Sequence, residues 1–92
     1  MGRNSMRRVT LDFSGIALRY ELHLALKKAF GFPEYYGMNL DALHDCLTDI
    51  TEETEIEILN ADELAESLGS YGAAAIHVIE DSAEENKHIE IL

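Results

Sequence analysis

Four polar side chains, Asp41, His44, Asp45 and Thr48, recur at helical spacing within residues 40–50. At about 100° per residue, they fall within roughly 100° of one another on one face of a helix. Asp41 and Asp45 form a like-charged pair four residues apart, which costs an isolated helix about 0.2–0.5 kcal/mol. The pattern fits an ordinary solvated face, and it also fits a face that binds a basic group.

Two other kinds of chemistry compete for these residues. A catalytic metal site usually needs three protein ligands, and two carboxylates and one imidazole on a convex helix enclose no ion. Paired carboxylates catalyse hydrolysis only in a cleft that separates their pKa values. Cys46 lies at the edge of the apolar side, so we expect a buried thiol rather than a nucleophile. We therefore expect no catalytic residue, no metal site and no cofactor.

The opposite side of the same segment is apolar. It carries Leu40, Leu43, Leu47 and Ile50, with Cys46 at its edge. An apolar stripe of this kind packs on a core. Asn39 suits the N-cap of a helix that runs to about Asp49, and Asp41 in the first turn suits the helix dipole.

The segment that precedes this helix carries two adjacent tyrosines. Tyr35 and Tyr36 stand beside Gly37, directly before the acidic face. Large amphipathic rings next to a few charges are typical of protein-binding hot spots. The plainer interpretation is that one ring packs inward and the other is simply exposed. Parity favours Tyr36 as the inward ring.

The net charge of −11 is unevenly distributed. Residues 1–28 carry +4, whereas the chain from Ala29 onward carries −15, with Lys87 as its one basic residue. Such a field repels nucleic acid and anionic lipid, and it attracts basic proteins. We therefore expect no nucleic-acid binding, no membrane binding and a basic protein partner, although acidic excess also serves solubility alone.

The one cysteine of the chain and its lack of a long apolar stretch suggest a cytoplasmic protein. Cys46 has no partner for an intrachain disulfide, which favours a reducing compartment. No stretch approaches the roughly 20 apolar residues of a membrane span. We expect residues 1–6 to be a disordered or vector-derived leader and residues 7–92 to form a single domain.

Short strands separated by helices predict an α/β domain of two layers with parallel strands. The expected strands are residues 7–13, 55–59 and 89–92. The expected helices are residues 16–30, 40–49, 61–68 and 71–85.

The run PEYYGMNLDALHDCLT at residues 33–48 resembles the barstar family, whose pattern is PEYYGxNLDALxDCLT. Every fixed position of that pattern is matched. Weaker similarity extends from Arg7 to the C-terminus and includes Leu26-Lys27-Lys28 and the closing Ile89-Glu90-Ile91-Leu92. The resemblance implies a two-layer barstar-like fold, with a three-stranded parallel sheet packed against about four helices.

The resemblance also implies a function. Members of the barstar family are intracellular inhibitors of barnase-type ribonucleases, and their second helix and preceding loop plug the enzyme's active site. By this resemblance, Asp45 occupies the substrate-phosphate position, Asp41 faces an arginine and backbone amides, and Tyr35 packs on the catalytic histidine. Lesser contacts fall at Gly37, Asn39, Leu40 and Thr48, and a looser alignment adds Asp81. The implied partner is a basic, extracellular-type ribonuclease bound 1:1 by a chain that is monomeric when free.

The chain departs from the family at three positions in or near this surface. His44 and Ile50 stand where the family has tryptophans, and Asp81 replaces a glutamate. The target therefore need not be barnase, and an alternative is a barstar-fold acidic module redirected to a different basic protein or toxin nuclease. A metal-dependent hydrolase is a third alternative. Because histidine changes charge near neutrality, His44 is expected to make binding depend on pH.

Overall fold

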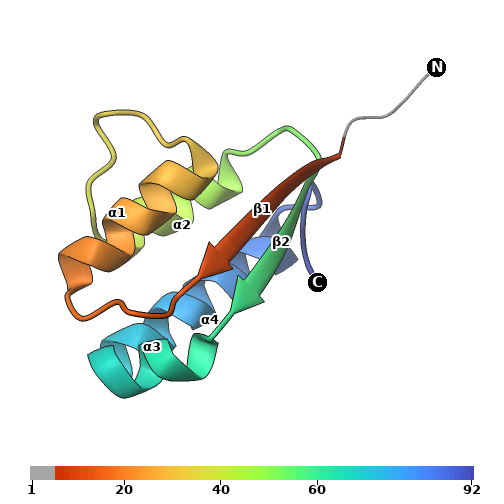
Figure 1. Cartoon of the computed structure of the whole chain (residues 1–92). Coiled ribbons are helices and arrows are strands. Elements are labelled where there is room, and N and C mark those ends of the chain that lie inside the picture. The colour runs from red at the N-terminus through yellow and green to blue at the C-terminus, as the bar shows by residue number, and fades with distance from the viewer. Residues whose placement is uncertain (1–5) are drawn as a thin grey trace.

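Three strands form one parallel sheet in a computed structural model that describes residues 6–92. β1 spans Arg7–Asp12, β2 spans Thr54–Leu59 and β3 spans Ile89–Ile91, with β2 between the other two (Figure 1). Both pairings are parallel. The predicted three-stranded parallel sheet is therefore confirmed.

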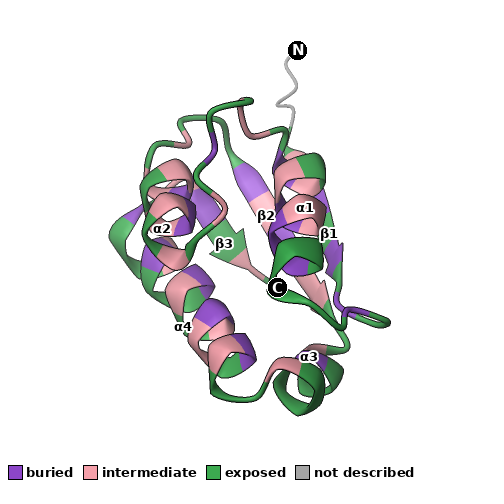
Figure 2. Ribbon diagram, turned by 90° about the vertical axis from the view of Figure 1, so that its left-hand side faces the viewer, coloured by how far each residue is buried: buried purple, intermediate pink, exposed green. Residues whose placement is uncertain are grey.

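Four helices complete the second layer and lie against one face of the sheet (Figures 1 and 2). α1 spans Arg19–Phe30, α2 spans Leu40–Thr48, α3 spans Ala61–Leu68 and α4 spans Ser70–Glu85. This arrangement confirms the two-layer α/β prediction. The predicted bounds equal the observed ones or differ from them by one residue, except at one end.

The start of α1 is the exception, because the helix was expected from Ile16 and begins at Arg19. The Glu21 carboxylate accepts hydrogen bonds from the backbone N–H groups of Ala17 at 2.8 Å and Leu18 at 3.1 Å. These bonds hold Leu18 as an extended N-cap, so the helix cannot begin earlier. Ile16 is buried as a residue of the preceding loop, which explains why its apolar character looked helical.

The strands alternate between a core face and a water face. Val9, Leu11 and Ile56 are at most 2% exposed and meet the helices. The opposite face is polar, and there Arg8 Nε lies 3.2 Å from a carboxylate oxygen of Glu55 across the β1–β2 pair. Such alternation is uncommon in parallel sheets, which usually have both faces covered, and it fits a sheet with helices on one face only.

The expected leader, residues 1–6, lies almost entirely outside the described residues. Residues 1–5 lie outside the described residues, and Met6 is exposed. Among the helices of residues 6–92, none combines the length and the apolar character that crossing a membrane requires.

Gly72 sets how closely α3 approaches α4. A Cβ atom added at this buried position would lie 2.5 Å from the backbone carbonyl oxygen of Leu64, where neither atom can move without shifting a helix. In an uncrowded helical position, replacing glycine by alanine is stabilising by roughly 0.5–1 kcal/mol.

We therefore predict that Gly72→Ala lowers the free energy of unfolding by about 1–3 kcal/mol, as overpacked cores do. Urea denaturation measures this change. The control is Ala73→Ser at an exposed position of the same helical turn, expected to stay within about 0.5 kcal/mol of the parent. Unchanged or increased stability of Gly72→Ala would contradict the packing described here.

Candidate partner-binding site

The acidic helix is fixed at its start by the residue expected there. The Asn39 side-chain oxygen accepts a hydrogen bond from the backbone N–H of Ala42 at 2.7 Å, so Asn39 is the N-cap, as predicted. Its Nδ2 donates to the carbonyl oxygen of Gly37 at 3.2 Å. We call the segment between α1 and α2 that carries Tyr35 and Tyr36 the tyrosine loop. The Asn39 side chain thus joins this loop to the first turn of α2.

The two sides of α2 have opposite environments. Leu43 and Leu47 are fully buried, whereas Asp41 and Asp45 are exposed. At the end of the helix, Asn86 Nδ2 donates to the carbonyl oxygens of Leu47 and Ile50, each at 2.9 Å. These contacts hold α2 rigidly, so the direction of its acidic side is determined by the core.

The sequence interpretation placed the carboxylates on a convex helix, and the structure adds a neighbouring helix beside them. α4 packs beside α2, and residues of the two helices line an open hollow of about 520 Å³. Its lining consists of Leu40, Asp41, His44, Asp45, Val78, Asp81 and Glu85. Four acidic residues from two helices therefore line one hollow together with two aliphatic residues.

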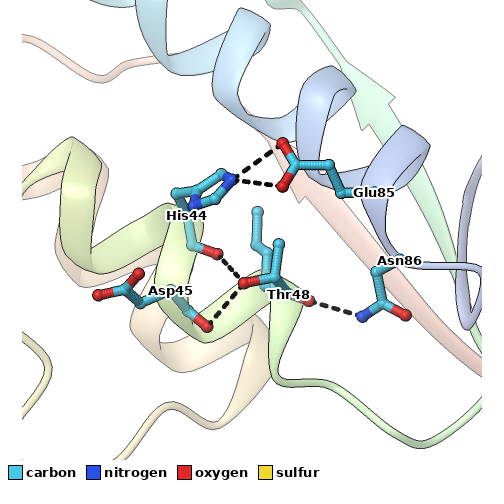
Figure 3. Close-up of polar contacts among 6 residues, drawn as sticks. His44, Asp45, Thr48, Glu85 and Asn86 are labelled. Atoms are coloured by element: carbon cyan, nitrogen blue, oxygen red, sulfur yellow. Dashed lines mark hydrogen bonds and ion pairs between the residues drawn. The ribbon is translucent and has the colours of Figure 1, made fainter.

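His44 makes an ion pair across this hollow with Glu85. His44 Nε2 lies 3.2 Å and 3.1 Å from the two carboxylate oxygens of Glu85 (Figure 3). The hydrogen bond that the His44 ring donates to the Glu85 carboxylate raises the pKa of His44, and the charges of Glu85, Asp45 and Asp81 act in the same direction. Glu85 was missed by the sequence interpretation, although its position four residues after Asp81 places both on one face of α4.

Thr48 and Asp45 point in different directions on the acidic side. The Thr48 hydroxyl donates within its own helix, to the carbonyl oxygens of His44 at 2.8 Å and Asp45 at 3.2 Å (Figure 3). Its proton is therefore used locally, and only its lone pairs face outward. The Asp45 carboxylate points away from Glu85 (Figure 3), and Asp45 is exposed.

The tyrosine loop divides as parity predicted. Tyr36 is 5% exposed and Tyr35 is 86% exposed. Both tyrosines line a hollow of about 270 Å³ that also includes Asp45. Its lining consists of Tyr35, Tyr36, Gly37, Ala42, Asp45 and Cys46. Asp45 thus lines the acidic hollow and also two hollows beside Tyr35.

Cys46 is half-buried at the edge of the apolar side, as expected, and it is a free thiol. Burial raises the pKa of this thiol, and the charges of Asp49 and Asp45 raise it further. A raised pKa leaves little thiolate near neutrality, which makes the sulfur a poor nucleophile. Within residues 6–92, no group of three or more His, Cys, Asp or Glu side chains is arranged to hold a metal ion.

Comparison with known proteins places this chain beside a family of inhibitors. A family model described as Barstar (barnase inhibitor) matches residues 6–91. The Bacillus subtilis (strain 168) protein named "Putative ribonuclease inhibitor YrdF" is 39% identical over 83 residues, which cover 89% of this chain and 91% of that protein.

The His44–Glu85 pair predicts a measurable titration. The pKa of His44, read from its ring protons by NMR, should lie above the ordinary value of about 6.5 and should fall in Glu85→Gln. Because the folded value is the higher one, the pair stabilises the fold below about pH 6.5 and this contribution is lost as pH rises through the raised pKa. Glu84→Gln is the matched control, since it removes one charge from an exposed neighbour. An equal fall in both variants would show a general field effect instead of a specific pair.

Proposed function

This chain belongs to the barstar family, and from that premise we propose that it inhibits a basic ribonuclease of the barnase type by covering the enzyme's active site. The tyrosine loop and the acidic side of α2 form the covering surface. The chain is in this view an inhibitor and not an enzyme, as its sequence suggested. It acts in the cytoplasm, where a reducing environment keeps the lone Cys46 as a thiol.

The observation that carries this proposal is the set of four carboxylates that two helices bring to one hollow. Asp41 and Asp45 from α2, and Asp81 and Glu85 from α4, all line it. A ribonuclease active site must bind a phosphodiester, so it presents basic groups. Carboxylates offer anionic acceptor oxygens to the same groups and can therefore replace the phosphate.

Each residue of the surface has a proposed role. Asp45, which is exposed and lines the acidic hollow as well as the hollows beside Tyr35, takes the substrate-phosphate position. Asp41 faces an arginine of the enzyme, and the exposed Tyr35 ring stacks on its catalytic histidine. Lesser contacts come from Gly37, Asn39, Leu40, Thr48, His44 and Asp81.

The charge of the whole chain supports encounter with such a partner. The net charge is −11, and positions from Ala29 onward account for −15 before the basic N-terminal part offsets it. A field of this sign accelerates association with a basic protein and disfavours nucleic acid and anionic membranes. One enzyme molecule is proposed to bind one monomeric inhibitor.

A second candidate partner is a basic protein other than a barnase-type enzyme, and His44 is the observation that favours it. A histidine paired to Glu85 stands in the middle of the acidic side, where the family pattern has a large aromatic ring. This replacement changes both the shape and the charge that a partner meets. Capture experiments with the two classes of partner would distinguish them.

The role of Asp45 is tested by Asp45→Ala. We predict a loss of about 2 kcal/mol or more in binding free energy, the level at which an interface residue counts as a hot spot. Surface plasmon resonance against a bound ribonuclease measures it. Asp62→Ala, which removes the same charge from the exposed surface of α3, should change affinity little. Tight binding left intact in Asp45→Ala would refute the assigned site.

The role of His44 is tested by the pH dependence of affinity between about pH 5.5 and 8. A cationic His44 repels a basic partner. It does so even though the same hollow is lined by four acidic residues, Asp41, Asp45, Asp81 and Glu85. As pH rises through its raised pKa, the imidazole loses its charge and affinity should increase.

His44→Gln is the control for titration within the partner, because that titration is common to both inhibitors. The ratio of parent to variant affinity should therefore rise with pH. A ratio that is flat across the range would eliminate His44 as a pH-sensitive contact.

A further inference from the structure

A buried histidine outside the acidic side joins three segments of the chain. His23 of α1 is 1% exposed. Its Nδ1 lies 2.7 Å from the hydroxyl oxygen of Tyr36 in the tyrosine loop, and its Nε2 lies 2.7 Å from that of Tyr71 in α4. Both ring nitrogens therefore have a partner, one on each side of the imidazole.

These two hydrogen bonds suit a neutral imidazole. A neutral ring has one donor and one acceptor nitrogen, and each tyrosine hydroxyl can play either role. The three groups therefore satisfy one another in either direction without a buried charge. Burial lowers the pKa of His23, which keeps the ring in this neutral form near pH 7.

The far end of this chain of hydrogen bonds is held by a third contact. The guanidinium carbon of Arg19 lies 4.1 Å from the centroid of the Tyr71 ring, a cation–π geometry. Arg19 and His23 are four residues apart on one face of α1, so α1 holds Tyr71 at its ring and at its hydroxyl. The anchor for His23 is thus part of the rigid helical layer.

The near end positions the tyrosine loop. The Tyr36 ring packs on Phe32 with centroids 4.9 Å apart, and Phe32 stacks on Phe30 at 5.2 Å. The backbone N–H of Tyr36 donates to the carbonyl oxygen of Pro33 at 3.0 Å. Tyr36 is therefore held by its hydroxyl on His23 and by its backbone N–H on Pro33. The backbone that carries Tyr35 has little freedom as a result.

We propose that His23 is a positioning residue for the partner-binding loop. By holding the Tyr36 hydroxyl, it keeps the wall of the hollow beside Asp45 in the shape that a partner meets, and it presents the exposed Tyr35 ring without touching the partner itself. This inference rests on the proposed function of the acidic side. Its consequence is that affinity depends on a residue with 1% exposure, because a loop ordered in advance does not lose that freedom on binding.

The matched variants are Tyr36→Phe and Tyr71→Phe. Each removes one hydroxyl from the same imidazole, but the first releases the loop and the second releases α4. His23→Leu removes both hydrogen bonds at similar volume. His23→Gln restores a donor and an acceptor and should rescue part of the effect.

The first measurement needs no partner. Amide hydrogen exchange followed by NMR should show the Tyr36 amide exchanging about tenfold faster or more in Tyr36→Phe and His23→Leu, with β2 amides changed much less. Tyr71→Phe should leave the loop close to the parent. If loop and β2 amides accelerate in equal proportion, His23 stabilises the fold in general and the positioning role is overturned.

The second measurement is the affinity for a barnase-type ribonuclease that binds the parent chain, at a temperature well below the unfolding midpoint. His23→Leu and Tyr36→Phe should each weaken it by about tenfold, and the double variant should lose no more than either one, because both break the same link. Unchanged affinity, or fully additive losses, would overturn the positioning role. If the parent binds no ribonuclease, the proposed function fails, and the exchange experiment still decides whether His23 orders the loop.

Discussion

The burial of one side of α2 is the constraint on which the rest of the structure depends. Leu43 and Leu47 are completely removed from solvent, and Asn86 binds the carbonyl groups at the end of the helix. Since residues on a helix keep fixed angular relations, burying these two leucines forces Asp41 and Asp45 outward. A helix of nine residues is too short to be stable alone, so its acidic side has a defined direction only because its apolar side is packed.

The same packing brings together charges that repel one another. Asp81 and Glu85 of α4 face the carboxylates of α2 across a shared hollow. Contacts of this kind oppose the packing of the two helices, and the buried leucines must outweigh them. The His44–Glu85 pair offsets part of the repulsion. A surface that keeps such charges close is poorly suited to stability alone, and it is well suited to a basic partner, whose arrival removes the repulsion.

Local features of the sequence were sufficient for the elements and for the two sides of α2. The N-cap at Asn39, the inward Tyr36 and the three parallel strands follow from spacing, capping preference and alternation, which act over a few residues. The start of α1 did not, because the apolar Ile16 belongs to a loop that the Glu21 side chain closes. Periodicity does not distinguish a buried loop residue from the first turn of a helix.

The parts of the candidate site that were missed depend on contacts between distant positions. His44 and Glu85 are 41 residues apart, and His23 and Tyr71 are 48 apart. Nothing in the local pattern around either histidine identifies its partner, because the pairing is decided by how α4 packs on α1 and α2. The hollow between the helices is a product of that packing. The sequence interpretation therefore described a convex helix and did not include the hollow that α2 and α4 line.

We propose that the acidic side of α2 occupies a ribonuclease active site. It is tested most directly by titrating this chain calorimetrically into a panel of barnase-type ribonucleases, with residual activity measured on the same samples. We expect that at least one enzyme is bound with a stoichiometry of one to one, that activity disappears at equivalence, and that a nucleotide held in the active site weakens binding. A panel with no binding, or a bound enzyme that keeps its activity and ignores the nucleotide, would contradict it.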